Sequence, residues 1–236
     1  MRSIESYIEQ VTQTLSDLPL NHIQDVVEVL LSANYVGSTV FIVGNGGSAA
    51  TASHFACDLA KGTITPGRPR FRVTALTDNV PLMTAWSNDV AYEDLFVEQL
   101  RSLMRRGDVL VGISGSGNSP NVLRAVELAR QSGGVTLGFS GFDGGRLSEM
   151  VDVPVVVPSQ CMEQIEDVHL TLCHLVCTEL RERMKRIEPP VSLMLDTTAW
   201  QEVRQPGPAC PLPSVGPRNE SGNGRQASGQ PAEAYS

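Results

Sequence analysis

The feature of this 236-residue chain that most restricts its fold is a regular alternation of strand-like and helix-like segments, which begins near Ser38. Short apolar runs rich in β-branched residues predict buried strands, and each is followed by a segment with helical spacing of its apolar residues. The predicted strands are residues 40–43, 71–76, 109–113, 136–139 and 153–157. The predicted helices are residues 49–60, 81–86, 92–104, 120–131, 145–150 and 162–186. This alternation predicts an α/β fold with a doubly wound, five-stranded parallel sheet that binds ligands at the carboxyl ends of its strands.

Two helical segments precede the alternating region, and a segment of different composition follows it. Ile4, Ile8, Val11 and Leu15 form one helical stripe, and a second helix is predicted around residues 23–31. A helix outside the alternation has no sheet of its own to cover, so its stripe suits packing against another subunit, with packing on its own domain as the alternative.

The region after residue 188 has the composition of a disordered tail. Residues 189–236 contain eight of the fifteen prolines and few residues able to build a core. A short helix at about residues 193–203 is the one alternative within it. We therefore expect a domain at residues 1–188, with N-terminal helices within 1–34 and an α/β core at 38–188, followed by a tail at 189–236.

Composition excludes several classes of protein. The formal net charge is −8 and the isoelectric point about 5.0, which argues against a face that binds nucleic acid. We expect no membrane span and no signal peptide, because the apolar runs are short and the N-terminus lacks a basic-then-apolar pattern, so a cytoplasmic location is expected. Five cysteines without a CxxC motif indicate neither a disulfide framework nor a structural zinc site.

The third predicted strand ends at Ile113 in a loop of hydroxyls and glycines. The loop residues of interest are Ser114, Gly115, Ser116, Gly117 and Ser119. Ser119 and Pro120 suit the N-cap and first position of the following helix, whose N–H groups and positive dipole end favour a phosphate dianion. The loop has no lysine, so it is not a Walker loop. An ordinary polar turn is the alternative to a phosphate site.

The first predicted strand ends in a second glycine-rich turn. Gly44, Gly46 and Ala49 fit the dinucleotide fingerprint, which keeps an NAD(P)-dependent oxidoreductase open as an alternative. Asp78, the acidic residue after the second strand, comes later than the fingerprint requires. Two phosphate-binding turns in one crevice fit a compact sugar phosphate better than a dinucleotide.

Histidines and carboxylates recur on two of the predicted helices. His54 and Asp58 are four residues apart and share one helix face, and Glu166 and His174 lie two turns apart on the last helix. These four residues have the composition of a divalent metal site. The alternative is structural, with histidines in the core and carboxylates as partners of helix dipoles.

Five motifs, taken in order, carry a resemblance to a known family. They are GNGGS at 44–48, HFA at 54–56, GISGSGNS at 112–119, GFDGG at 141–145 and QIEDVH at 164–169, with His174 beyond the last. Over residues 1–187 the chain resembles the phosphoheptose isomerase branch of the SIS (sugar isomerase) superfamily. The resemblance implies a flavodoxin-like sheet, a homotetramer or a dimer with active sites at subunit interfaces, and isomerisation of sedoheptulose 7-phosphate to D-glycero-D-manno-heptose 7-phosphate.

The resemblance also implies roles for individual residues. The expected contacts to the sugar phosphate are Asn45, Gly46, Gly47, Ser48, Asn88, Asp89, Ser114, Gly115, Ser116, Ser119 and Glu166. The serine-rich loop takes the phosphate, and the paired Asn88 and Asp89, read here as a polar break before the helix at 92, contact the sugar. The family's zinc ligands correspond to His54, Asp58, Glu166 and His174, which implies one zinc ion per subunit.

Two of the four metal positions depart from the family pattern. Asp58 replaces a glutamate that is also the family's proposed catalytic base, and Glu166 replaces a glutamine. Aspartate reaches about 1.5 Å less far, and a shift of about 1 Å can lower a rate about a hundredfold. Glu166 adds a negative charge that strengthens metal binding and supplies a second acid or base. We therefore expect Asp58 or Glu166 as the base and His174 as its acid/base partner.

Three classes of function remain after the sequence alone. An aldose–ketose isomerase is favoured, because titratable groups occupy all four metal positions. A non-catalytic sugar-phosphate-binding SIS regulator or partner protein is the main alternative. The NAD(P)-dependent oxidoreductase is the third.

Overall fold

The computed structural model of the chain describes residues 3–186. The predicted tail at 189–236, its helix at 193–203 and the domain boundary at 188 lie outside the described residues. The first half contains α1 (Ile4–Ser16), α2 (Leu20–Val36), β1 (Thr39–Gly44), α3 (Gly47–Cys57), a π-helical turn η1 (Asp58–Gly62), β2 (Arg72–Ala75) and α4 (Val80–Asp89). The second half contains a 3₁₀ turn η2 (Tyr92–Asp94), α5 (Leu95–Leu103), β3 (Val109–Ile113), α6 (Pro120–Gln131), β4 (Val135–Ser140), α7 (Gly145–Met150), β5 (Val153–Val156) and α8 (Met162–Lys185).

The five strands form one parallel sheet in the order β2-β1-β3-β4-β5, which confirms the predicted fold class. The chain leaves β1 for β2 on one side and returns to β3 on the other, so the topological switch point lies between β1 and β3. Gly44, the last residue of β1, is paired with Ile113, the last residue of β3. The glycine-rich turn and the serine-rich loop therefore begin next to each other, where doubly wound sheets bind ligands.

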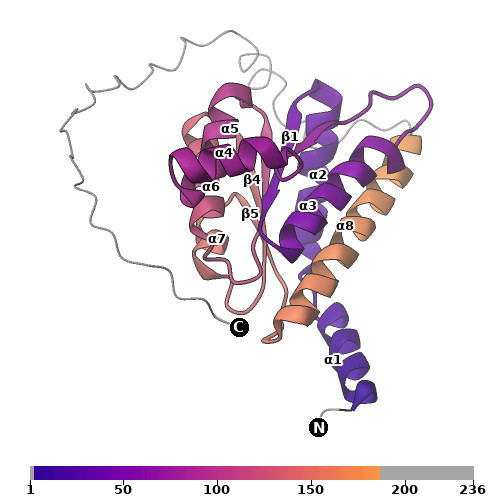
Figure 1. Cartoon of the computed structure of the whole chain (residues 1–236). Coiled ribbons are helices and arrows are strands. Elements are labelled where there is room, and N and C mark those ends of the chain that lie inside the picture. Colours follow the sequence, from indigo (N-terminus) through magenta and orange to yellow (C-terminus); the bar gives the residue numbers. More distant parts are fainter. Residues whose placement is uncertain (1–2, 187–236) are drawn as a thin grey trace, which may run out of the picture. The chain divides into compact units, whose positions relative to one another are not determined.

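Alternate residues of each strand feed two separate cores. Val40 and Ile42 of β1 pack in a core with α2, α3 and α8, and Phe41 and Val43 pack in a core with α5, α6 and α7. Figure 1 shows α2, α3 and α8 on one side of the sheet and α4 to α7 on the other. Continuous apolar strands are thus explained by burial on both faces.

The two N-terminal helices have different environments. α2 buries Val26, Val27 and Leu30 almost completely and packs against β1, β5 and α8, so the expectation that it lacks a sheet to cover is wrong. The reason is that α3 covers β1 and β2 and α8 contacts β4, which leaves β5 on this face for α2 to cover. The predicted stripe of α1, by contrast, leaves Ile4 79% and Ile8 58% exposed.

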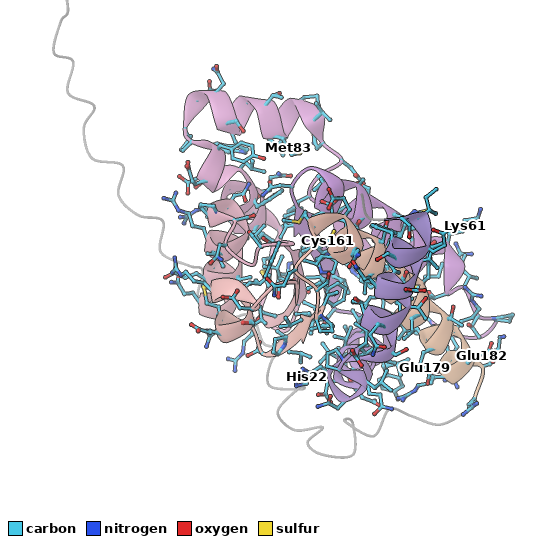
Figure 2. All side chains as sticks on the ribbon, turned by 90° about the horizontal axis from the view of Figure 1, so that it is seen from below. His22, Lys61, Met83, Cys161, Glu179 and Glu182 are labelled. Carbon is cyan, nitrogen blue, oxygen red and sulfur yellow. The ribbon has the colours of Figure 1, made fainter. Side chains whose placement is uncertain are left out.

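The segment between β2 and β3 also departs from prediction. Asn88 and Asp89 are the last two residues of α4, so the predicted polar break is wrong. The helix continues through them because the N–H of Val90 still donates to the carbonyl of Trp86. Its N-cap is Asn79, whose side chain accepts from the N–H of Leu82. No residue of α4 is buried, although Met83, labelled in Figure 2, and Trp86 are partly buried against the core.

Candidate functional site

The serine-rich loop after β3 has its hydroxyls arranged around a helix start. Ser114 Oγ and Ser119 Oγ lie 3.0 Å apart, and Ser116 Oγ accepts a hydrogen bond from the N–H of Asn118. Ser119 occupies the predicted N-cap position, but its side chain makes no capping bond and faces Ser114 instead. Within residues 3–186, the backbone N–H groups of Gly115, Ser116 and Ser119 have no hydrogen-bond partner. Unpaired N–H groups and hydroxyls at the start of α6 are what a phosphate needs.

The two glycines of this loop make room for the protein itself. A methyl group at Gly115 would lie 2.5 Å from the sulfur of Met162, and one at Gly117 would lie 2.0 Å from the carbonyl oxygen of Gly144. Gly115 and Gly117 are thus required by the close approach of Met162 and of the GFDGG turn, in which Gly144 and Gly145 have positive φ. The GFDGG turn at 141–145 therefore has a structural role.

The turn after β1 provides the start of α3. Gly46 adopts a φ of 53° and precedes the helix, and Ser48 is buried in its first turn. A methyl group at Gly47 would lie 2.6 Å from each carboxylate oxygen of Glu166. The carboxylate of Glu166 therefore lies against the first turn of α3, where the helix dipole favours a negative charge.

Asn45 in this turn has two partners that sequence reasoning missed. Its side chain pairs with the amide of Asn121, in the first turn of α6, and accepts a hydrogen bond from the hydroxyl of Tyr92. The position of Asn121, directly after the Ser119–Pro120 helix start, could have marked it as a site residue. Its pairing with Asn45, 76 residues away, is not visible in the sequence.

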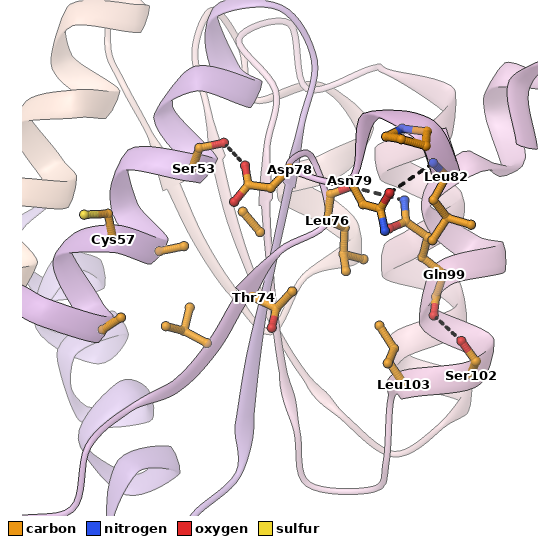
Figure 3. A pocket seen from close by; sticks show the side chains of 15 residues that line it. Ser53, Cys57, Thr74, Leu76, Asp78, Asn79, Leu82, Gln99, Ser102 and Leu103 are labelled. Atoms are coloured by element: carbon orange, nitrogen blue, oxygen red, sulfur yellow. Dashed lines mark hydrogen bonds between the residues drawn. The ribbon is translucent and has the colours of Figure 1, made fainter. Parts of the chain in front are cut away.

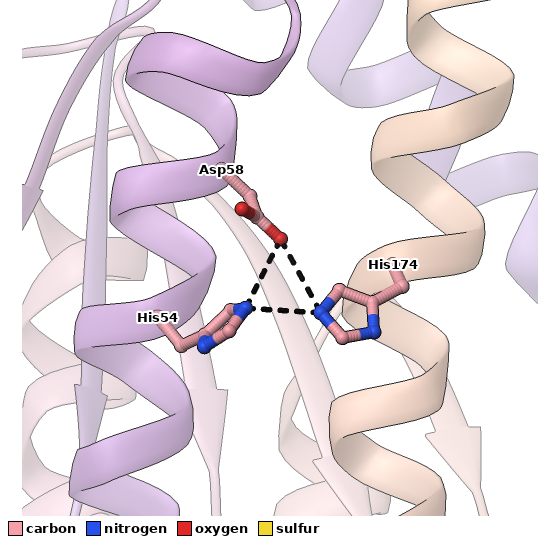
Figure 4. A group of neighbouring side chains, drawn as sticks. All are labelled: His54, Asp58 and His174. Carbon is pink, nitrogen blue, oxygen red and sulfur yellow. Dashed lines mark hydrogen bonds and ion pairs between the residues drawn. The ribbon is translucent and has the colours of Figure 1, made fainter.

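Three of the four predicted metal-ligand residues come together between α3 and α8. His54 Nε2 lies 2.9 Å from His174 Nε2, and Asp58 Oδ2 lies 3.4 Å from His54 Nε2 and 3.6 Å from His174 Nε2. Figure 4 shows the three side chains meeting across the gap between the two helices. About half of each histidine side chain is exposed, so a ligand can reach the group.

The two helices run parallel, which explains where Glu166 lies. Successive residues of α8 lie opposite successive residues of α3 and η1. The three contacts are Glu166 with Gly47, His174 with His54, and Arg181, which donates to the carbonyl of Gly62 at 2.7 Å. Glu166 is thus about two turns before His174 and is not part of the group of ligand atoms that lie within 4.8 Å of one another. The group is a candidate site for a divalent metal with three protein ligands.

His169 on α8 is a structural histidine. It is 1% exposed, and its Nε2 lies 3.1 Å from the carbonyl oxygen of Ser140, so Nε2 carries the proton and donates. Burial lowers the pKa of His169 to about 4. It is therefore neutral near pH 7 and separate from His174.

Asn88 and Asp89 are exposed at the end of α4. Asn88 Nδ2 donates to Asp89 Oδ1 at 2.8 Å, and no hydrogen bond within residues 3–186 joins either side chain to the loops after β1 and β3. Their role in binding the sugar stays a prediction.

A separate cavity of about 820 Å³ lies beside the edge strand β2, between α3 and the α4–α5 region. Figure 3 shows apolar and polar side chains lining it, among them Ser53, which donates to Asp78. The histidine pair and the serine-rich loop do not line it. The candidate site is therefore placed at the switch point, where the loops after β1 and β3 begin next to each other.

Comparison with known proteins decides the family. The SIS domain family matches residues 3–141. The phosphoheptose isomerase of Geotalea daltonii is 38% identical over 184 residues, which cover 78% of this chain and 93% of that protein. The chain belongs to the phosphoheptose isomerase family. The relative from Akkermansia muciniphila is 40% identical over 161 residues, covering 68% of this chain and 84% of that protein.

Solved structures agree with this family. The phosphoheptose isomerase of Neisseria gonorrhoeae has a TM-score of 0.70 and 30% identity, covering 76% of this chain and 97% of that chain. The sugar isomerase domain of a Sphaerobacter thermophilus RpiR transcription factor, at 20% identity and a TM-score of 0.54, shares the fold alone. The chain is therefore an aldose–ketose isomerase of the SIS fold, and the oxidoreductase and non-catalytic alternatives lose their support. None of the described helices has the length and apolar character needed to cross a membrane.

Proposed function

We propose that the protein converts sedoheptulose 7-phosphate to D-glycero-D-manno-heptose 7-phosphate. The observation that carries this proposal is the meeting of His54, Asp58 and His174 on two helices of an isomerase-family fold, beside a switch-point crevice with a phosphate-binding loop. An aldose–ketose isomerase needs an anion site at one end of its substrate and acid/base groups at the other. The crevice supplies both.

The phosphate is held by the serine-rich loop. Ser114, Ser116 and Ser119 supply hydroxyls, Gly115 supplies a backbone N–H just after β3, and Ser119 supplies one at the start of α6. Hydrogen bonds to a dianion are stronger than those between neutral groups, and a helix start adds a favourable dipole. The sugar hydroxyls contact the turn after β1, at Asn45, Gly46, Gly47 and Ser48, and the exposed pair Asn88 and Asp89.

The residues present fit a zinc ion, one per subunit. Two imidazole nitrogens and a carboxylate oxygen are donors that zinc prefers, and ligand atoms around tetrahedral zinc lie about 3.3 Å apart. The three separations of 2.9, 3.4 and 3.6 Å bracket that value. His54, Asp58 and His174 hold the metal, with Glu166 as a fourth ligand if its side chain turns from Gly47. When bound, the metal supplies positive charge that stabilises negative charge on the substrate oxygens.

Proton transfer is assigned to residues of the same crevice. A base removes the proton from C1 of the ketose and returns it to C2, while an acid/base partner moves a proton from O1 to O2. Either Asp58 or Glu166 is the base, and His174 is the partner. The position of Glu166 outside the three-residue group supports it as the base. A side chain held as a metal ligand is not free to move a proton, so Asp58 and His174 take part in proton transfer only when they exchange off the metal.

A homotetramer is the proposed assembly, with a dimer as the alternative. The exposed Ile4 and Ile8 on α1, and α4 without a buried residue, support interfaces with other subunits. Light scattering on the purified protein tests this: a single-chain mass would remove the proposal. A cytoplasmic location is also proposed, in keeping with a phosphorylated metabolite as substrate.

The experiment that tests the function is turnover of sedoheptulose 7-phosphate by purified, metal-replete protein, followed by NMR of the sugar. A double variant, Asp58→Ala with His174→Ala, is the control. Formation of the aldoheptose phosphate by the wild type and not by the variant supports the proposal. If the wild type binds the ketose phosphate without converting it, the substrate assignment is wrong.

A further inference from the structure

The side chain of Asn45 lies at the centre of a small hydrogen-bond network. Asn45 Nδ2 donates to Asn121 Oδ1 at 2.8 Å, and Asn121 Nδ2 donates back to Asn45 Oδ1 at 2.9 Å. The hydroxyl of Tyr92 donates to the same Asn45 Oδ1 at 2.9 Å. We call Asn45, Asn121 and Tyr92 the amide clamp.

The orientation of both amides follows from one backbone group. The N–H of Val122 donates to Asn121 Oδ1 at 2.9 Å, and an N–H cannot face the NH₂ side of an amide. This contact fixes which side of Asn121 is oxygen. The reciprocal pairing then fixes Asn45, so its oxygen faces Asn121 Nδ2 and the hydroxyl of Tyr92.

The clamp determines what Asn45 offers to a ligand. Its Oδ1 already accepts two hydrogen bonds, and one N–H of Nδ2 is used by Asn121. Within residues 3–186 the second N–H of Nδ2 has no partner. A carboxamide fixed in this way acts as a donor and recognises a substrate oxygen through its lone pair.

The clamp also joins three separate segments of the crevice. Asn45 belongs to the turn after β1, Asn121 to the first turn of α6 next to the serine-rich loop, and Tyr92 to η2, just after Asn88 and Asp89. Asn121 is 1% exposed, and an ion pair of 2.6 Å between Arg124 of α6 and Asp94 holds η2 in place. A buried amide whose oxygen and nitrogen both have hydrogen-bond partners is held in one orientation, so the three segments keep one arrangement.

We propose that Asn121 and Tyr92 are positioning residues that fix Asn45 as a hydrogen-bond donor to an oxygen of the sugar phosphate. This inference rests on the proposed function, since it takes Asn45 as a contact to the substrate. Asn121 and Tyr92 act through Asn45 and do not touch the reacting atoms.

Single variants test the direction of the effect. Asn121→Ala is expected to raise KM for sedoheptulose 7-phosphate about tenfold and Tyr92→Phe about threefold, the range of one net hydrogen bond, with kcat within about twofold. Matched controls are Asn34→Ala, a buried asparagine that donates to the carbonyl of Pro69, and Tyr35→Phe, whose exposure of 56% is close to the 54% of Tyr92. Neither control residue contacts the crevice, so both are expected to keep the wild-type KM.

A double-variant cycle separates positioning from a general loss of structure. In an Asn45→Ala background, Asn121→Ala and Tyr92→Phe are expected to leave KM unchanged, because residues that act through one partner are not additive. An additive rise in KM overturns the proposal. If Asn121→Ala fails to fold, the double-variant cycle of Asn45→Ala with Tyr92→Phe tests the proposal by itself, because Tyr92 is exposed.

A crystal structure of the Tyr92→Phe protein tests the amide clamp without a turnover assay. If the wild type does not convert sedoheptulose 7-phosphate, the proposed substrate is wrong, and the clamp is judged by the Asn45 side chain. Displacement of Asn45 from its wild-type place supports the clamp. An Asn45 side chain that keeps its place without Tyr92 overturns it.

Discussion

The serine-rich loop and the histidine pair are two parts of the proposed active site that arise in different ways. The loop is local: Ser114 and Ser119 are five residues apart, and β3 and α6 place their hydroxyls 3.0 Å from each other. The pair is long-range: His54 and His174 are 120 residues apart and meet because α3 and α8 pack side by side. The first depends on one turn, and the second depends on the whole core beneath two helices.

The two regions suit different tasks: the loop suits substrate binding, and the histidine pair suits the chemical step. The loop offers N–H groups that have no partner among residues 3–186, which suit the unreactive phosphate end of a substrate. The histidines and Asp58 are partly exposed and titratable, which suits proton transfer and metal binding. Variants in the two regions should therefore fail in different ways.

The largest effect is expected at the long-range pair. His174→Ala should lower kcat for sedoheptulose 7-phosphate about a thousandfold, because it removes both an acid/base group and a metal ligand. The measurement is steady-state turnover together with metal content. His22→Ala, a partly buried histidine on α2, is the control and should change neither. Unchanged turnover in His174→Ala would remove this histidine from the mechanism.

The next largest effect is a loss of stability, which tests whether the serine-rich loop depends on its contact with the GFDGG turn. Gly117→Ala places a methyl group 2.0 Å from the carbonyl of Gly144 at a φ of +66°, so we expect about 3 kcal/mol or more of lost stability in urea unfolding. Gly67→Ala has a similar φ of +76° with nothing near the methyl group, and it should lose only the 1–2 kcal/mol of backbone strain, to order of magnitude. Equal losses in the two variants would mean that the contact with Gly144 is unimportant.

A third prediction separates the buried histidine of α8 from the exposed one. The folded-state pKa of His169 is about 4, below the ordinary value of 6.5, so between these values the unfolded chain binds one more proton than the native protein. The free energy of unfolding should therefore fall as pH falls from about 6.5 towards 4, by about 1.4 kcal/mol per pH unit from this residue.

Urea unfolding at several pH values measures this slope. His169→Gln, which keeps an N–H donor for the carbonyl of Ser140, should flatten the dependence across this range. A variant with the wild-type slope would show that other groups cause it.

The smallest effect is expected in the local region. Ser119→Ala should raise KM about tenfold with kcat nearly unchanged, because one hydrogen bond to the phosphate is lost equally from ground state and transition state. Ser132→Ala, at the opposite end of α6, is the control and should keep the wild-type KM. A fall in kcat without a rise in KM would mean that Ser119 acts on the reacting atoms, and the loop would then not be limited to substrate binding.

The same division explains what the sequence could predict. The strands, the helix start at Ser119–Pro120 and the glycine turn at 141–145 follow from local patterns, and the structure has them. The meeting of His54 with His174 was expected because the residue types suited a metal and because the family resemblance implied it. The place of Glu166 against Gly47 was not visible, since it depends on the parallel alignment of α3 with α8.

Two further misses have the same cause. The covering of the sheet by α2 and the pairing of Asn45 with Asn121 both join segments far apart in the sequence. Local patterns predict which helix, strand or turn a residue occupies, but tertiary packing determines which distant side chains it contacts.

The measurement that tests the account most directly is a crystal structure of the Asp58→Ala protein with sedoheptulose 7-phosphate bound. The account predicts the phosphate within hydrogen-bond distance of Ser114 and Ser119, and the C1–C2 end of the sugar directed towards His174 and Glu166. A phosphate bound at Gly46 and Gly47, with the carbonyl end at the serine-rich loop, would contradict it.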